Sequence, residues 1–174
     1  MNRFLFVALI FAGFAQAALA QRTDKIFLQG NAAGTQTVQH EPGGAVRAEY
    51  SFNDRGRGDH IVATWKLDAN GIPTEYEGRG NDYMKAPVDE HFEMKDGRAK
   101  WKNRSEQGDQ PVSGQAFYLP MDAPPEFTAV LARALLKAPN HKLALLPAGE
   151  ASIEAGEKAN AGQTELTANR ITGL

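Results

Sequence analysis

The sequence predicts a mainly β fold, an antiparallel meander sheet that is curved or barrel-like and is covered by one amphipathic helix. Two runs, Val46–Phe52 and His60–Leu67, carry this prediction because apolar and polar side chains alternate along most of their length. A period of two places successive side chains on opposite faces of a strand, so each run should bury one face. The periodicity becomes helical once, near residues 125–137, and that segment supplies the cover.

Turn signals separate and extend these two runs. The Asn/Asp/Gly cluster at residues 53–59 supplies the positive-φ and side-chain-capped positions that a reversal needs. Asn70-Gly71 is a strong hairpin signal, after which residues 72–77 return as a third strand. We therefore expect a meander that the rest of the mature chain extends or covers.

Shorter alternating runs flank the meander. Further strands are expected at residues 24–29, 35–40, 88–94, 98–102 and 115–119. The first two form an edge hairpin, because the second of them has few large apolar groups. Asp96-Gly97 turns the next pair into a hairpin. Residues 103–114 are polar, contain Gly and Pro, and are expected to form a loop.

The helix prediction depends on one apolar stripe. The stripe spaces its residues at i, i+3, i+4, i+7 and i+8: Phe127, Val130, Leu131, Ala134 and Leu135. Asp122 is a suitable cap before the helix-compatible Pro124 and Pro125. The stripe should pack on the apolar face of the sheet and form the core between them.

The C-terminal part of the sequence is expected to contain strands at residues 142–146, 151–154 and 164–171, with a loop at 156–162. The sequence ends at residues 171–174 without a polar tail, and from this we expect a piece of a longer protein.

The first 20 residues resemble a secretory signal peptide and are not expected to belong to the fold. Arg3 gives a positive start, residues 4–14 are almost wholly apolar, and Ala18-Leu19-Ala20 offers small residues for cleavage. The apolar run is shorter than the roughly 20 residues of a membrane anchor. We expect a mature domain of residues 21–174, periplasmic or secreted, with no membrane contact after cleavage.

Charge and cysteine content narrow the classes of partner. The mature chain has 18 basic side chains (19 less Arg3) against 21 acidic ones, a net charge near −3. This balance gives no electrostatic argument for nucleic acid as a partner. Cysteine is absent, so stability must come from packing rather than disulfides, which suits an exported bacterial protein.

Two similar loops contain the candidate binding residues. Arg55 and Arg57 lie in the first loop, and Arg79, Asn81 and Asp82 lie in the second. If both loops lie at the same end of the sheet, the three arginines form a clamp for an anion or an acidic surface. The simpler alternative is that Gly and Asp form the turns and the arginines solubilise them.

No residue is assigned a catalytic or metal-binding role. The four histidines are isolated and form no helix-spaced metal pair. Asp89, His91 and Glu93 share one strand face, which a solvated polar surface explains more simply than a metal. The sequence has no phosphate loop and no nucleophile elbow, so no cofactor is expected in this chain.

Five aromatic residues on the predicted strands are candidates for an apolar pocket: Tyr50, Phe52, Trp65, Phe92 and Trp101. Aromatic side chains in such positions more often form plain core. A pocket would make the chain a free-standing periplasmic binding or carrier protein for a small apolar ligand.

Several short segments together resemble the N-terminal region of exported bacterial amidohydrolases. These segments are Asn53-Asp54-Arg55-Gly56-Arg57-Gly58, Gly80-Asn81-Asp82-Tyr83, Lys85-Ala86-Pro87-Val88-Asp89-Glu90, Trp101-Lys102, Phe117-Tyr118, Leu145-Leu146-Pro147-Ala148-Gly149 and Ile171-Thr172-Gly173-Leu174. In that family a β-rich domain precedes a metal-dependent hydrolase barrel, which contains the metal ligands and the catalytic acid.

The resemblance implies that this chain is a non-catalytic accessory domain of a hydrolase acting on C–N bonds. Its partner would be the downstream catalytic domain of the same polypeptide, which it would support or border. A divalent metal such as zinc is then expected only in that downstream barrel. The carrier protein remains the alternative, and independent enzyme activity is a third hypothesis.

Overall fold

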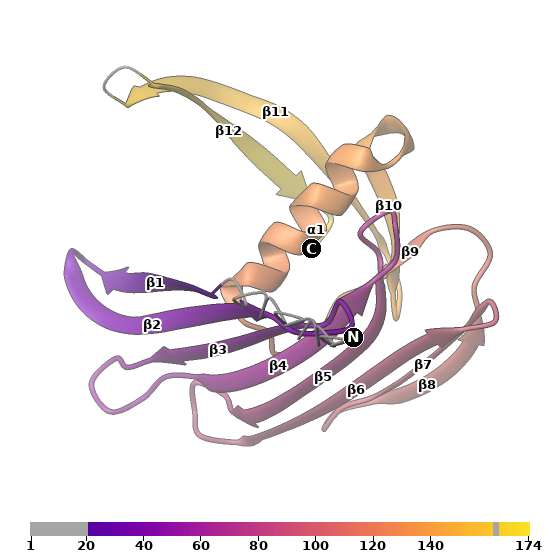
Figure 1. Ribbon diagram of the computed structural model, residues 1–174, viewed down its shortest axis with the longest axis horizontal. Coiled ribbons are helices and arrows are strands. Elements are labelled where there is room, and N and C mark those ends of the chain that lie inside the picture. Colours follow the sequence, from indigo (N-terminus) through magenta and orange to yellow (C-terminus); the bar gives the residue numbers. More distant parts are fainter. Residues whose placement is uncertain (1–20, 162–163) are drawn as a thin grey trace, which may run out of the picture.

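The computed structural model describes residues 21–161 and 164–174; the predicted signal peptide lies outside them. Eight strands form one large antiparallel sheet in chain order: β1 (Gln21–Leu28), β2 (Asn31–His40), β3 (Val46–Phe52), β4 (His60–Leu67), β5 (Pro73–Asn81), β6 (Pro87–Lys95), β7 (Arg98–Lys102) and β8 (Gln107–Pro111). The sheet is curved but open, with β1 and β8 as its edges (Figure 1). The predicted mainly β meander is confirmed, without closure into a barrel.

A second, smaller sheet has the strand order β12-β11-β10-β9. Its strands are β9 (Ala116–Tyr118), β10 (Lys142–Leu146), β11 (Glu150–Ala161) and β12 (Thr164–Thr172). β9 and β10 run parallel, because α1 (Pro125–Lys137) and a short 3₁₀ turn (Pro139–His141) return the chain between them. The β11–β12 hairpin extends away from the rest of the fold (Figure 1).

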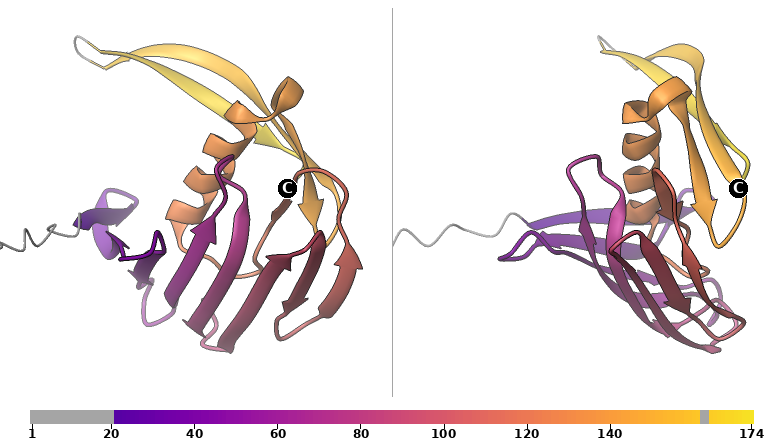
Figure 2. Two further views of the ribbon diagram at one scale, coloured as in Figure 1. Left: turned by 45° about the vertical axis from the view of Figure 1, so that its right-hand side comes forward. Right: turned by 90° about the vertical axis from the view of Figure 1, so that its right-hand side faces the viewer.

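The core lies where α1 packs between the two sheets (Figure 2). The predicted apolar stripe of α1 is buried as expected. Phe127, the first residue of this stripe, contacts Trp65 edge-on at 5.3 Å between ring centroids, Tyr76 at 5.0 Å, and Phe117 of β9 at 5.5 Å. One helical side chain therefore joins both sheets, and truncating it would leave a cavity in the core.

Side chains of the large sheet hold the start of α1. The N-cap is Pro124 and makes no side-chain cap bond, so the predicted cap at Asp122 is wrong. Gln36 on β2 takes this role, because its Oε1 accepts a hydrogen bond from the backbone N–H of Glu126 at 2.8 Å. The Glu126 carboxylate, 8% exposed as a residue, pairs with Arg22 of β1 and, at 2.7 Å, with Arg133. These bonds compensate the burial of a charge next to the helix N-terminus.

Three predicted loops contain strand. Residues 78–81 continue β5, residues 107–111 form β8, and residues 156–161 continue β11. Each segment is rich in Gly and polar residues, so local propensity favours a loop. Pairing with a neighbouring strand satisfies their backbone groups and overrides that propensity.

Among the residues that the structure describes, no helix is long and apolar enough to cross a membrane.

Gly80 is required by the close approach of two backbones. It pairs with Ile61 on β4 and has φ +141°, and an added Cβ would lie 1.8 Å from the carbonyl oxygen of His60. Gly80→Ala should therefore lower the free energy of unfolding by on the order of 2 kcal/mol or more. Urea denaturation followed by far-UV circular dichroism measures the change.

Gly43→Ala is the matched control, because Gly43 has φ +85° but no atom within 4 Å of the added Cβ. Gly43→Ala should lower the free energy of unfolding only by the cost of placing alanine in a left-handed conformation, about 1–2 kcal/mol. Equal losses in the two variants would contradict the proposed steric role of Gly80.

Candidate functional site

The β3–β4 and β5–β6 connections meet at one end of the large sheet, which we call the loop end (residues 53–59 and 82–86). The backbone N–H of Gly58 donates to the carbonyl of Tyr83 at 3.1 Å, and the Tyr83 hydroxyl donates to Asp54 at 2.9 Å. Lys85 Nζ donates to the carbonyl of Gly58 at 2.9 Å. The two candidate loops therefore lie at the same end of the sheet, as the predicted arginine clamp requires.

The three arginines of the predicted clamp have different surroundings. Arg55 has 89% of its side chain exposed and lies 3.9 Å from Asp54. Arg57 lies over the ring of Tyr83, with its Cζ 5.3 Å from the ring centroid. Arg79 lies within β5, between Gly78 and Gly80, and its side chain is 3.7 Å from Asp89. Arg79 therefore belongs to the outer face of the sheet, while Arg55 and Arg57 belong to the loop end.

Asn81 and Asp82 shape the β5–β6 turn. Asp82 Oδ1 accepts hydrogen bonds from the backbone N–H groups of Met84 and Ala86, both at 2.9 Å. Its Oδ2 accepts from Arg104 at 2.5 Å, and this bond and the two backbone bonds lower the pKa of Asp82. Asn81 Nδ2 donates to the carbonyl of Gly58 at 3.3 Å. The hydrogen bonds of Asn81 and Asp82 therefore stabilise the β5–β6 turn and its contact with the first loop.

The most deeply buried carboxyl group near the loop end belongs to Glu90 on β6, which is 1% exposed. Its Oε1 accepts hydrogen bonds from the Tyr118 hydroxyl at 2.5 Å and the Met121 backbone N–H at 3.0 Å. Its Oε2 accepts from the backbone N–H of Asp122 at 3.3 Å. Glu90 thus ties the large sheet to β9 and to the segment that leads into α1.

Burial dominates the electrostatics of this cluster. It raises the pKa of Glu90, an effect that the hydrogen bonds from Tyr118, Met121 and Asp122 reduce but do not cancel. Burial also raises the pKa of Asp122, against the opposing effect of Arg104. The pKa of Asp59 is raised by burial and by the nearby Asp122 and Asp82 carboxylates.

Sequence reasoning did not single out Glu90, although a signal was present. Val88, Phe92 and Met94 alternate with polar residues in the predicted strand at residues 88–94, and Glu90 has the same parity as these three. A charged residue in an apolar alternation is expected to be buried with partners. The partners are non-local, however, because Tyr118 is 28 positions away in the sequence.

The five aromatic residues of the predicted apolar pocket lie on the face of the sheet toward α1. Trp65, Phe92 and Trp101 are core residues, and Phe92 stacks on Tyr118 with ring centroids 4.2 Å apart. Tyr50 and Phe52 are half-buried nearer the loop end. The three core rings pack as expected of a protein interior, and ligand binding by this face stays a prediction.

Within residues 21–161 and 164–174, no group of three or more His, Asp or Glu side chains is arranged to hold a metal ion. His91 Nε2 lies 3.2 Å from Asp89 Oδ1, and its Nδ1 lies 3.8 Å from Glu77 Oε1. The imidazole thus bridges two carboxylates on the outer face of the sheet.

Comparisons with protein-family models, with curated proteins and with solved structures find no match to this chain. What the site can do must therefore be argued from its geometry. Glu90 has three donors on its two oxygens, and its partner Asp122 is connected through Arg104 to Asp82 in the β5–β6 turn. Met84 and Arg55 are among the exposed groups of the loop end.

Replacing Glu90 tests this role. In Glu90→Gln the amide group must face at least one of the backbone N–H donors of Met121 and Asp122. An unsatisfied buried donor costs about 1–3 kcal/mol, so the free energy of unfolding at pH 7 should fall by that amount. Glu93→Gln, three positions along the strand and exposed to solvent, should change it by less than about 0.5 kcal/mol.

The pH dependence has a defined sign. A pKa that is raised in the folded state contributes stability that is present at low pH and is lost as the pH rises through the folded pKa. As the pH falls from 7 toward 4.5, wild-type protein should therefore gain stability relative to Glu90→Gln, because the pKa of Glu90 is raised above its ordinary value of 4.5. An equal pH response of the two proteins in urea denaturation would contradict the burial of this carboxyl group.

Proposed function

We propose that this chain is the non-catalytic N-terminal domain of an exported metal-dependent amidohydrolase, and that its loop end faces the downstream catalytic barrel. In this role the domain supports the barrel or borders the mouth of its active site. The proposal rests on the resemblance to that family and on the way the fold assembles the residues that carry it.

The observation that carries the proposal is the convergence of three of the family-like segments. Residues 53–58 lie apart in the sequence from residues 80–83 and 85–90, but the three segments meet at the loop end. Hydrogen bonds between Gly58 and Tyr83 and between Lys85 and Gly58 join these segments, and Glu90 extends the network to Tyr118. Segments that share a resemblance and also share one surface are expected to share one role.

The exposed side chains of the loop end, together with those of the neighbouring Arg104 and Met121, suit a protein interface. Met84 is 67% exposed and Met121 is 46% exposed. Arg104 connects the two positions, because it pairs with Asp82 at 2.5 Å and with Asp122 at 3.5 Å. Arg55 and Arg57 lie on the first loop. Methionine and arginine are enriched at protein–protein interfaces, whereas lysine and glutamate are depleted there.

A divalent metal such as zinc has no role in this chain's part of the proposal. The described His, Asp and Glu side chains do not form a donor set for one ion, and the carboxylates of the Glu90 cluster are engaged by Tyr118, Arg104 and backbone N–H groups. The domain's own contribution is to position a rigid loop surface.

The reading frame gives the first test. The gene should continue past the codon of Leu174 into a metal-dependent hydrolase barrel. A natural stop codon directly after Leu174 would remove the proposal.

Activity of the separate domain gives a second test. Purified residues 21–174 with added zinc should hydrolyse no amide substrate above the buffer rate, followed by amine release. Turnover that scales with protein concentration would show that the domain is catalytic.

An interface variant tests the role of the loop end. In the longer protein, Met84→Asp should weaken packing on the barrel and lower amidase activity or the thermal midpoint, because it places a charge in a desolvated contact. In residues 21–174 alone the same change should alter the free energy of unfolding by less than about 0.5 kcal/mol.

Leu136→Asp is the control. Leu136 is 49% exposed and lies near the C-terminus of α1, outside the loop end. It should leave the activity of the longer protein unchanged. Equal activity in Met84→Asp and wild-type protein would contradict an interface at the loop end.

A further inference from the structure

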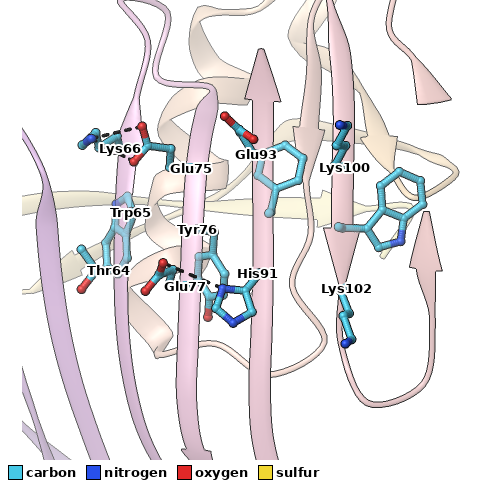
Figure 3. Close-up of a pocket in the computed structure, with 12 residues that line it drawn as sticks. Thr64, Trp65, Lys66, Glu75, Tyr76, Glu77, His91, Glu93, Lys100 and Lys102 are labelled. Carbon is cyan, nitrogen blue, oxygen red and sulfur yellow. Dashed lines mark hydrogen bonds and ion pairs between the residues drawn. The ribbon is translucent and has the colours of Figure 1, made fainter. Parts of the chain in front are cut away.

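The outer face of the large sheet, opposite α1, contains a shallow trough across strands β4 to β7. Its volume is about 700 Å³, within the range of small-molecule sites in proteins. Figure 3 shows charged side chains from all four strands projecting into it, including Lys66, Glu75, Glu93 and Lys100.

The strand register arranges these side chains in two rows. One row contains Lys66, Glu75, Glu93 and Lys100, which are successive cross-strand partners. The other row contains Thr64, Glu77, His91 and Lys102, which are also successive partners. Because neighbouring strands lie about 4.8 Å apart, Glu77 on β5 and Lys102 on β7 are separated by roughly 10 Å at the backbone.

The charges in the trough sum to zero but are segregated. Its three glutamates lie on β5 and β6, while two of its three lysines lie together on β7. Lys66, the third, pairs with Glu75 at 2.9 Å on the far side. The trough therefore has an acidic centre and a basic wall, and its field favours a dipolar ligand over a simple anion or cation.

Several of these charges have no partner of their own. Within the described part of the chain, Glu93, Lys100 and Lys102 form no ion pair within 4.0 Å, whereas Glu77 lies 3.8 Å from His91. Glu93 also stands directly opposite Glu75 in the register. Like charges placed opposite one another destabilise a sheet, and a bound cationic group would relieve this repulsion.

We propose that the trough binds a zwitterionic short peptide. The ammonium group lies between Glu77 and Glu93, and the carboxylate lies between Lys100 and Lys102. A tripeptide, at about 3.4 Å per residue, spans the roughly 10 Å from Glu77 on β5 to the two lysines on β7. The site lies on the outer face of the sheet and involves no loop-end residue. A test of peptide binding is therefore independent of the proposed amidohydrolase role.

Titrations of ¹⁵N-labelled mature protein, followed by amide chemical shifts, test the proposal with three probes. Triglycine carries both charges, N-acetyl-triglycine lacks the ammonium group, and triglycinamide lacks the carboxylate. Triglycine should shift amides of β5, β6 and β7. Each blocked peptide should bind about two- to fivefold more weakly, the effect expected for one solvent-exposed charge pair.

Paired variants assign the two ends of the ligand. Lys100→Gln with Lys102→Gln should abolish the preference for triglycine over triglycinamide. Glu77→Gln with Glu93→Gln should abolish the preference over N-acetyl-triglycine. Lys25→Gln, an exposed change on β1, should alter neither preference.

Three results would overturn the proposal. One is the absence of any shift on β5 to β7 at the solubility limit of triglycine. Another is equal binding of all three peptides, and the third is equal binding of triglycine and N-acetyl-triglycine, which would indicate an anion site only.

Discussion

The buried carboxylate of Glu90 is the interaction on which the arrangement of this domain depends. A single side chain on β6 receives the Tyr118 hydroxyl from β9 and the backbone N–H groups of Met121 and Asp122. It therefore fixes the segment that leads into α1 against the large sheet. The same segment connects through Asp122 and Arg104 to the β5–β6 turn, so the loop end and the helix are held by one network.

The two faces of the large sheet have opposite characters, and each suits a different task. The inner face packs Trp65, Tyr76 and Phe92 against α1 and β9, and it supplies most of the stability of a fold without disulfides. The outer face contains alternating charges in rows fixed by the strand register. Among the described residues, the edge where the strands turn combines exposed methionine with arginine, and for this reason we propose the interface there and the peptide site on the outer face.

Much of the fold could be predicted from the sequence, because its main signals are local. Alternation identified β3 and β4, the apolar stripe identified α1, and Asn70-Gly71 identified a hairpin turn. The errors occur where pairing overrides propensity: Gly78 and Gly80 looked like loop residues but lie in β5. Asp122 looked like a cap, but the helix start is capped by Gln36, which lies 90 positions before its partner Glu126 in the sequence. The Glu90 network was missed for the same reason, since its donors come from β9 and the connection after it.

The central claim, that Glu90 is a buried and hydrogen-bonded anchor, can be measured directly. Carbon-13 NMR of the Glu side-chain carboxyl groups, titrated from neutral to acid pH, reports the pKa of each group. We expect a pKa for Glu90 above its ordinary value of 4.5, because the carboxyl group is buried. A measured pKa of Glu90 at or below 4.5 would contradict the buried anchor.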